Sequence, residues 1–150
     1  MDIRTAIHKA KLILKKKNIK SASLDTEILM SYIIKKERDY IILNSNKILS
    51  KQELDNFNYL VEQREKAEPI AYLIGKKYFW KYEFEVSKDT LIPRPDSELI
   101  VEHILELTKN RSKLNILDVG VGSGCLLLSV LKERTNFYGV GIDINQKCVN

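Results

Sequence analysis

Residues 114–125 read Leu-Asn-Ile-Leu-Asp-Val-Gly-Val-Gly-Ser-Gly-Cys, and this stretch decides the fold. Its first part, residues 114–119, is a short apolar run of the kind that forms a buried strand. A turn with three of the chain's six glycines follows, then an apolar helical segment over residues 125–131 and a second strand-like run over residues 137–142. A strand, a glycine-rich turn, a helix and another strand in this order predict the opening of a Rossmann-like domain.

The glycine-rich turn also predicts a ligand contact. A chain that leaves a strand sharply needs backbone freedom that side chains restrict, and a bound cofactor must approach that backbone closely. Asp143 ends the second strand, 23 positions after Gly120. This is close to the offset of about 20 residues at which a carboxylate meets the ribose hydroxyls of an adenosine. We therefore interpret the turn as a site for an adenosine-containing cofactor, with a helix N-cap as the alternative role of Asp143.

The residues beside the turn narrow the choice of cofactor. No Gly-Lys-Ser/Thr follows the turn, which argues against a phosphate-binding loop. Dinucleotide-binding domains carry Gly-x-Gly-x-x-Gly, whereas residues 120–124 read Gly-x-Gly-x-Gly. Asp118 precedes the turn, where a carboxylate is unfavourable beside a pyrophosphate but suits a cationic ligand such as S-adenosylmethionine. A plain strand-to-helix turn without a ligand remains the alternative.

The first 68 residues carry helical patterns. Apolar residues recur at helical spacing over residues 3–17, and we expect a second helix capped by Ser23 and a third over residues 38–43. Residues 50–53, Ser-Lys-Gln-Glu, form a capping-box pattern that opens a fourth helix, which we expect Pro69 to end. Four short helices predict a small bundle.

A different pattern follows Pro69. Residues 78–86 are rich in aromatic side chains, and apolar and charged residues alternate there with a period of two, which predicts a β-hairpin. Residues 92–95, Ile-Pro-Arg-Pro, predict an extended segment, and a helix is expected from Pro95 onward. The expected fold is α + α/β: a helical bundle over residues 1–68, a β-hairpin linker over residues 69–94, and the first part, about two strands, of a Rossmann-like domain over residues 95–150.

Composition and charge limit the function classes. No apolar run approaches the roughly 20 residues of a membrane span, and no signal-peptide core follows Met1, so we expect a cytoplasmic protein. Cys125 and Cys148 have no metal-ligand spacing, so no metal site is expected. Residues 1–66 hold 14 Lys/Arg against 9 Asp/Glu, whereas the remainder is balanced. The basic section is either a solvated surface or a docking face for an acidic protein or RNA.

Residues 115–124 resemble motif I of the class I S-adenosylmethionine-dependent methyltransferases. Three upstream stretches resemble the peptide-chain release factor glutamine methyltransferases, the HemK/PrmC family: residues 68–75 (Glu-Pro-Ile-Ala-Tyr-Leu-Ile-Gly), 79–80 (Phe-Trp) and 91–98 (Leu-Ile-Pro-Arg-Pro-Asp-Ser-Glu). The family's usual form is Ile-Pro-Arg-Pro-Glu-Thr-Glu, so this chain differs mildly at Asp96 and Ser97. Ribosomal-protein glutamine methyltransferases typically have Arg-Ser-Pro after the first proline, which this chain lacks.

The resemblance implies transfer of a methyl group from S-adenosylmethionine to the glutamine side chain in the Gly-Gly-Gln motif of a release factor. It assigns Asp118 to the methionine end of the cofactor and Asp143 to the ribose. Arg94 and Glu98 would border the methionine carboxylate and the substrate, or form an ion pair that fastens the linker to the core. The implied cofactor-binding residues are Asp118, Gly120, Val121, Gly122, Ser123, Gly124 and Asp143. The basic residues 1–66 would dock the release factor.

The family's catalytic Asn-Pro-Pro-Tyr motif is absent from this sequence, so no catalytic residue is assigned. We accordingly interpret the chain as the N-terminal part of the enzyme, inactive by itself and prone to aggregation or disorder beyond residue 112. Two other functions stay open: a non-enzymatic partner-docking fragment, and a methyltransferase acting on nucleic-acid amino groups. The upstream motifs disfavour binding of nucleic acid.

Overall fold

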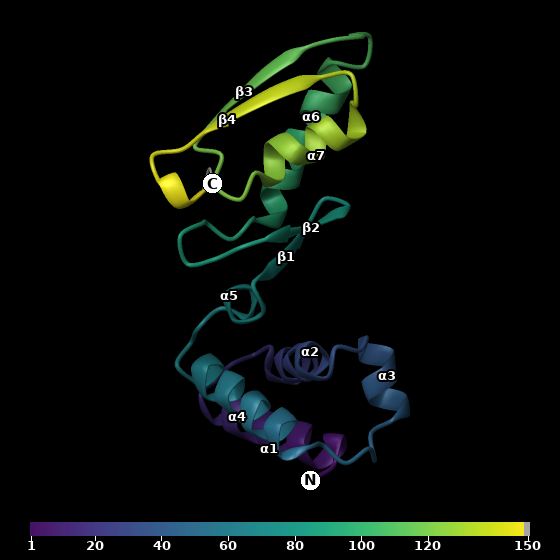
Figure 1. Ribbon diagram of the computed structural model, residues 1–150, viewed down its shortest axis with the longest axis vertical. Coiled ribbons are helices and arrows are strands. Elements are labelled where there is room, and N and C mark those ends of the chain that lie inside the picture. The colour runs from purple at the N-terminus through teal and green to yellow at the C-terminus, as the bar shows by residue number, and fades with distance from the viewer. Residues whose placement is uncertain (149–150) are drawn as a thin grey trace. The chain divides into compact units, whose positions relative to one another are not determined.

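Five α-helices build the first of two units of the chain, Met1–Ile74, in a computed structural model that describes residues 1–148 (Figure 1). The helices are α1 (Ile3–Lys16), α2 (Ala22–Ile34), α3 (Arg38–Leu43), α4 (Lys51–Glu65) and α5 (Ile70–Ile74). Helix α2 contacts each of the other four, so it is the central element of the unit. No helix in the described part of the chain is long and apolar enough to cross a membrane.

Local side-chain contacts set the starts of these helices. At α4 the backbone N–H of Glu53 donates to Ser50 Oγ at 3.1 Å and Glu53 Oε2 accepts from the N–H of Ser50 at 2.7 Å, which confirms the capping box. The predicted cap of α2 by Ser23 is wrong. The helix begins at Ala22, two residues earlier than a Ser23 cap implies, with Ser21 as the N-cap residue. The Ser21 hydroxyl donates to Asp25 Oδ2 at 2.8 Å and makes no capping hydrogen bond.

The core of this unit is apolar and contains one buried ion pair. Phe57, Leu29 and Ile3 are fully buried between α1, α2 and α4. Asp25 lies among them with an exposed fraction of 4%, and its Oδ2 accepts from Arg64 Nε at 2.8 Å. Since a buried charge is costly without a partner, this pair ties the end of α4 to the start of α2.

The prediction that Pro69 ends α4 is also wrong. The helix stops at Glu65, and Ala67 adopts a left-handed backbone conformation with φ of 69°. The carbonyl of Pro69 instead accepts from Leu73 N at 3.2 Å within the first turn of α5. Residues 70–74, expected in the hairpin linker, are therefore helical and pack on α2 and α4.

The second unit, Gly75–Asn150, begins with the expected β-hairpin. Strands β1 (Lys76–Phe79) and β2 (Tyr82–Glu85) pair antiparallel, with Phe79 opposite Tyr82. The remaining elements are η1 (Pro95–Ser97), α6 (Glu98–Leu107), β3 (Asn115–Val119), α7 (Cys125–Glu133), β4 (Tyr138–Ile142) and η2 (Gln146–Cys148). Strands β3 and β4 are parallel neighbours, joined through α7 as in a Rossmann-like crossover (Figure 1).

The two faces of the β3–β4 sheet differ. One face packs into a core that joins the hairpin to α6 and α7, through Phe79, Phe84, Val101, Val130 and Phe137. The other face exposes large apolar side chains, including Leu117, Val119, Tyr138, Val140 and Ile142. The chain thus combines an N-terminal helical domain with the start of a Rossmann-like fold, which confirms the expected fold class. The division at residues 68 and 94 stays a proposal.

Candidate functional site

The glycine-rich turn joins the end of β3 to the start of α7. Gly120, Gly122 and Gly124 have φ values of 84°, 52° and 73°, all in the left-handed region that side chains disfavour. Gly124 is the N-cap of α7, so the free N–H groups of the first helical turn lie directly after the turn. The three glycines are therefore required by the backbone path itself.

The turn is held by the end of the neighbouring strand. The N–H groups of Gly120 and Val121 both donate to the carbonyl of Ile142, at 2.8 and 3.0 Å. The N–H of Gly122 donates to Asp143 Oδ2 at 2.8 Å. The parallel pairing brings the ends of β3 and β4 to one edge of the sheet. Residues separated by 21 positions thus form one compact site.

Asp143 accepts two backbone hydrogen bonds. Its Oδ1 accepts from the N–H of Asn145 at 2.8 Å, and its Oδ2 accepts from Gly122. The Asn145 N–H, followed by that of Gly122, lowers the pKa of Asp143 below its ordinary value. The N–H of Ile144 also lowers this pKa, and the acceptor capacity left on the ionised carboxylate is available to a hydroxyl group of a ligand.

Asp118 lies on β3 opposite Gly141 of β4 and is partly buried. Burial raises the pKa of Asp118 above its ordinary value; the N–H of Leu127 lowers it, and the negative charge of Asp143 raises it. The site therefore has two acidic groups of different character: an Asp143 whose charge is stabilised by backbone N–H groups and an Asp118 whose charge is unfavourable without a nearby cation.

Val121 and Ser123 complete the turn. Gly141 lies against Val121, because a Cβ at position 141 would be 2.6 Å from Val121 Cγ2. The hydroxyl oxygen of Ser123 is buried and has no hydrogen-bond partner among the described residues. The close packing of Gly141 on Val121 makes the turn a defined structure rather than a loose connection.

Arg94 and Glu98 make no hydrogen bond or ion pair with the turn in the part of the chain that the structure describes. Glu98 Oε1 instead accepts from the backbone N–H of Trp80 at 2.9 Å. Trp80 has a φ of 56° at the tip of the hairpin, so Glu98 stabilises an otherwise unfavourable conformation there. Arg94 is exposed and precedes η1.

Two residues of the second unit with several contacts, one against the hairpin and one at the site, were not among the sequence predictions. Glu133, at the end of α7, accepts from Trp80 Nε1 and Tyr82 Oη, both at 3.1 Å, and pairs with Lys81 at 2.8 Å. Asn145 donates its backbone N–H to Asp143. The Asp-x-Asn pattern after a strand is typical of a side-chain-capped turn and was the available signal for Asn145, whereas nothing local indicated Glu133.

Comparisons with known proteins agree with this architecture. Residues 5–75 match the family model of the PrmC N-terminal domain. The chain is 42% identical over 150 residues to the release factor glutamine methyltransferase of Buchnera aphidicola subsp. Baizongia pistaciae, covering 100% of the chain and 54% of that protein. It is 40% identical over 130 residues to the enzyme of the same name from Aliivibrio fischeri, covering 86% of the chain and 45% of that protein. The chain spans about half the length of the curated relatives it matches.

The helical unit and the opening of a Rossmann-like sheet, together with these matches, show that the chain is homologous to part of a family of methyltransferases with a PrmC N-terminal domain. More particularly, the chain is a homologue of the release factor glutamine methyltransferases, and the resemblance to the HemK/PrmC family is confirmed.

Proposed function

We propose that the chain contributes the cofactor-binding turn and the docking domain of an S-adenosylmethionine-dependent enzyme that methylates the glutamine of the Gly-Gly-Gln motif in class 1 release factors. The observation that carries the proposal is the joining of Gly122 to Asp143, at 2.8 Å, at the common edge of two parallel strands. Ligands of open α/β sheets bind beyond the carboxyl ends of the strands, where this pair lies.

The residues present fit the proposed cofactor. The acceptor capacity left on the ionised Asp143 suits a ribose hydroxyl. Asp118 suits the cationic methionine end, since a nearby positive charge offsets the unfavourable burial of its carboxylate. Gly120, Val121, Gly122, Ser123 and Gly124 would line the cofactor with backbone rather than bulky side chains. When bound, the cofactor supplies an electrophilic methyl group.

We assign different roles to Arg94 and Glu98. Arg94 is exposed and makes no ion pair within residues 1–148, so it is available to a carboxylate of the cofactor or substrate. Glu98 already accepts from the Trp80 N–H, which favours a role in holding the hairpin. We therefore keep Arg94 as a candidate ligand-contacting residue and regard Glu98 as a residue that supports the structure beside it.

The first unit is the proposed docking domain for the release factor. It carries the excess positive charge, with 14 Lys/Arg against 9 Asp/Glu in residues 1–66. A cavity of about 270 Å³ there is lined by apolar residues of α1 and α3 together with the basic Arg4 and Lys11 and the acidic Glu27. The net positive charge of residues 1–66, beside these apolar contacts, suits an acidic, partly apolar protein surface.

The function is tested by incubating the whole protein with a purified release factor and radiolabelled S-adenosylmethionine. We expect label on the glutamine of the Gly-Gly-Gln motif, identified by peptide mass spectrometry, and none on a Gly-Gly-Glu variant of the release factor. Labelling of RNA or DNA instead would favour a nucleic-acid substrate. Binding of S-adenosylhomocysteine, followed by calorimetry, tests the cofactor site separately from turnover.

A further inference from the structure

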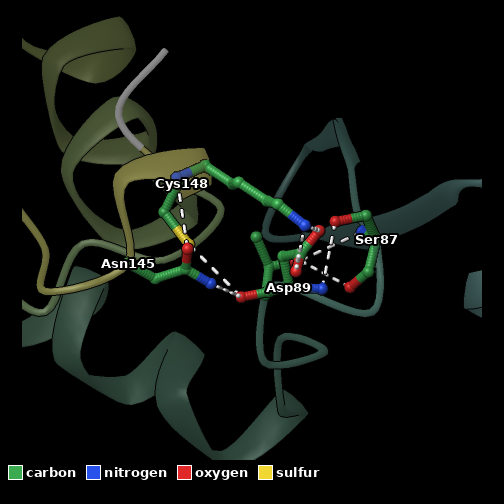
Figure 2. A network of polar contacts seen from close by, with 6 residues as sticks. Ser87, Asp89, Asn145 and Cys148 are labelled. Atoms are coloured by element: carbon green, nitrogen blue, oxygen red, sulfur yellow. Dashed lines mark hydrogen bonds and ion pairs between the residues drawn. The ribbon is translucent and has the colours of Figure 1, made fainter.

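The segment after β4 is tied to a turn that lies more than fifty residues earlier in the chain. Residues 87–90, between β2 and η1, close on themselves: the N–H of Thr90 donates to the carbonyl of Ser87 at 3.0 Å, and Ser87 Oγ accepts from the N–H of Asp89 at 3.2 Å. The turn therefore presents the carbonyl of Asp89 in a fixed position. Figure 2 shows this carbonyl facing Asn145 and Cys148.

Asn145 connects that carbonyl to the candidate cofactor site. Its side-chain Nδ2 donates to the Asp89 carbonyl at 3.0 Å, and its Oδ1 accepts from the N–H of Lys147 at 3.1 Å (Figure 2). Its backbone N–H donates to Asp143 Oδ1 at 2.8 Å. Each hydrogen-bonding group of the Asn145 side chain is thus used to orient the backbone that carries the contact with Asp143.

We propose that Asn145 is a positioning residue for cofactor binding: its side chain fastens residues 143–147 to the 87–90 turn and so aligns the Asp143 carboxylate with Gly122. The proposal rests on the proposed function, because it concerns the same cofactor site. Asn145 acts through Asp143 and the glycine-rich turn.

The hydrogen bonds that lead from the 87–90 turn to the glycine-rich turn, called the relay below, form a continuous series in the structure. It runs from the Asp89 carbonyl to Asn145, from Asn145 to Asp143, and from Asp143 to the N–H of Gly122, through hydrogen bonds of 3.0, 2.8 and 2.8 Å. Cys148 adds a weaker contact, with Sγ 3.3 Å from the Asp89 carbonyl. The ion pair of Lys147 with Asp89 is exposed and contributes little by comparison.

The relay also joins the segment before α6 to the segment after β4, which lie far apart in the sequence. The 87–90 turn directly precedes residues 91–98, the stretch that resembles the family's linker motif. The position of the acid that would bind the ribose therefore depends on the linker as well as on β4. Removal of the Asn145 side chain should weaken the alignment of Asp143 with Gly122 without removing any group that touches the cofactor.

The test is an Asn145→Ala variant of the whole protein, with two measurements. Loss of one net hydrogen bond should weaken S-adenosylhomocysteine binding by about threefold to tenfold and speed amide hydrogen exchange at Gly122 by a similar factor. The exchange measurement, made by NMR without ligand, reports on the contact of Gly122 with Asp143. A residue that merely adds stability would not change exchange at Gly122 selectively.

Two further variants serve as controls. Asp2→Ala removes a comparable cap, the 2.7 Å contact with Thr5 N, in the other unit and should change neither measurement. Asp89→Ala keeps the main-chain carbonyl and removes the carboxylate, so its effect should be smaller than that of Asn145→Ala. An equal or larger effect would assign the link to the ion pair with Lys147 and overturn the role of Asn145.

The outcomes separate the two proposals. If wild-type protein binds S-adenosylhomocysteine but Asn145→Ala changes neither affinity nor exchange at Gly122, the positioning role is wrong and the proposed function stands. If exchange at Gly122 accelerates in Asn145→Ala but wild-type protein binds no cofactor, the relay stands and the proposed function is wrong.

Discussion

The carboxylate of Asp143 accepts a 2.8 Å hydrogen bond from the backbone N–H of Gly122, so the residue that follows β4 holds the turn that follows β3. Such a contact fixes the turn before any ligand arrives. It also keeps the acid at the edge of the sheet, where a cofactor would meet it. The consequences of this arrangement are open to direct measurement.

Asp143→Asn should weaken the binding of S-adenosylhomocysteine by about tenfold or more, because hydrogen bonds to a charged acceptor are stronger than those to a neutral one. The substitution preserves size but leaves one acceptor oxygen, so only one of the two backbone contacts, with Gly122 or with Asn145, is retained. Isothermal titration calorimetry measures the effect, with Asp2→Asn as a control at a distant cap. Unchanged affinity would exclude a ribose contact by Asp143.

The stability of the second unit should depend on pH through Asp143. Because the N–H groups of Asn145 and Gly122 lower the pKa of the folded Asp143, its contribution is present above the unfolded pKa and is lost as the pH falls through the folded pKa. The wild type should therefore be more stable than Asp143→Asn at neutral pH, and the difference should shrink in acid. Thermal unfolding from neutral pH to about pH 3 measures this, and a pH-independent difference would contradict it.

Gly141→Ala should displace the turn and weaken cofactor binding. A Cβ there would lie 2.6 Å from Val121 Cγ2, and a β-branched side chain on a constrained turn has little room to move. Gly139→Ala is the matched control on the same strand, since its nearest atom is the flexible tip of Leu127 at 2.7 Å. Calorimetric titration of both variants should show a larger loss for Gly141→Ala; equal losses would mean that Val121 does not set the position of the turn.

Glu133→Gln should loosen the hairpin from α7. Lys81 first, and then the indole N–H of Trp80, lowers the pKa of Glu133, so the ionised side chain is the form that holds the hairpin. Trp80 is the only tryptophan of the chain, and its fluorescence reports on this contact directly. We expect a red-shifted emission and a lower Tm. Glu102→Gln, an exposed position on α6, is the control, and identical spectra for the two variants would refute the assignment.

Asp25→Ala should destabilise the first unit by about 3 kcal/mol, because it leaves Arg64 with an unpaired and largely buried charge. The Asp25 side chain is 6% exposed, and the Arg64 side chain is 17% exposed. Glu62→Ala, which removes the exposed partner of Lys66, should cost less than about 1 kcal/mol. Urea unfolding followed by circular dichroism compares the two. Similar losses would show that burial of the pair has little effect.

The spacing of residues along the sequence was sufficient to predict much of the architecture and the central residues of the site. The capping box of Ser50 and Glu53 acts across three residues, and the alternation of the hairpin acts across neighbours, so both were predicted correctly. The glycine-rich turn and Asp143 belong to one strand–helix–strand unit whose connection is short. Their proximity follows from the parallel pairing that such a unit adopts.

Sequence by itself therefore determined the helical first unit, the hairpin and the opening of the Rossmann-like sheet, because each depends on periodicity or on contacts between near neighbours. Only the tertiary structure decided the short helix α5, the contact of Glu98 with Trp80, the three contacts of Glu133, and the reach of Asn145 to Asp89 across 56 residues. These depend on which surfaces meet when the chain packs. A hydrogen bond between distant residues leaves no periodic trace in the sequence.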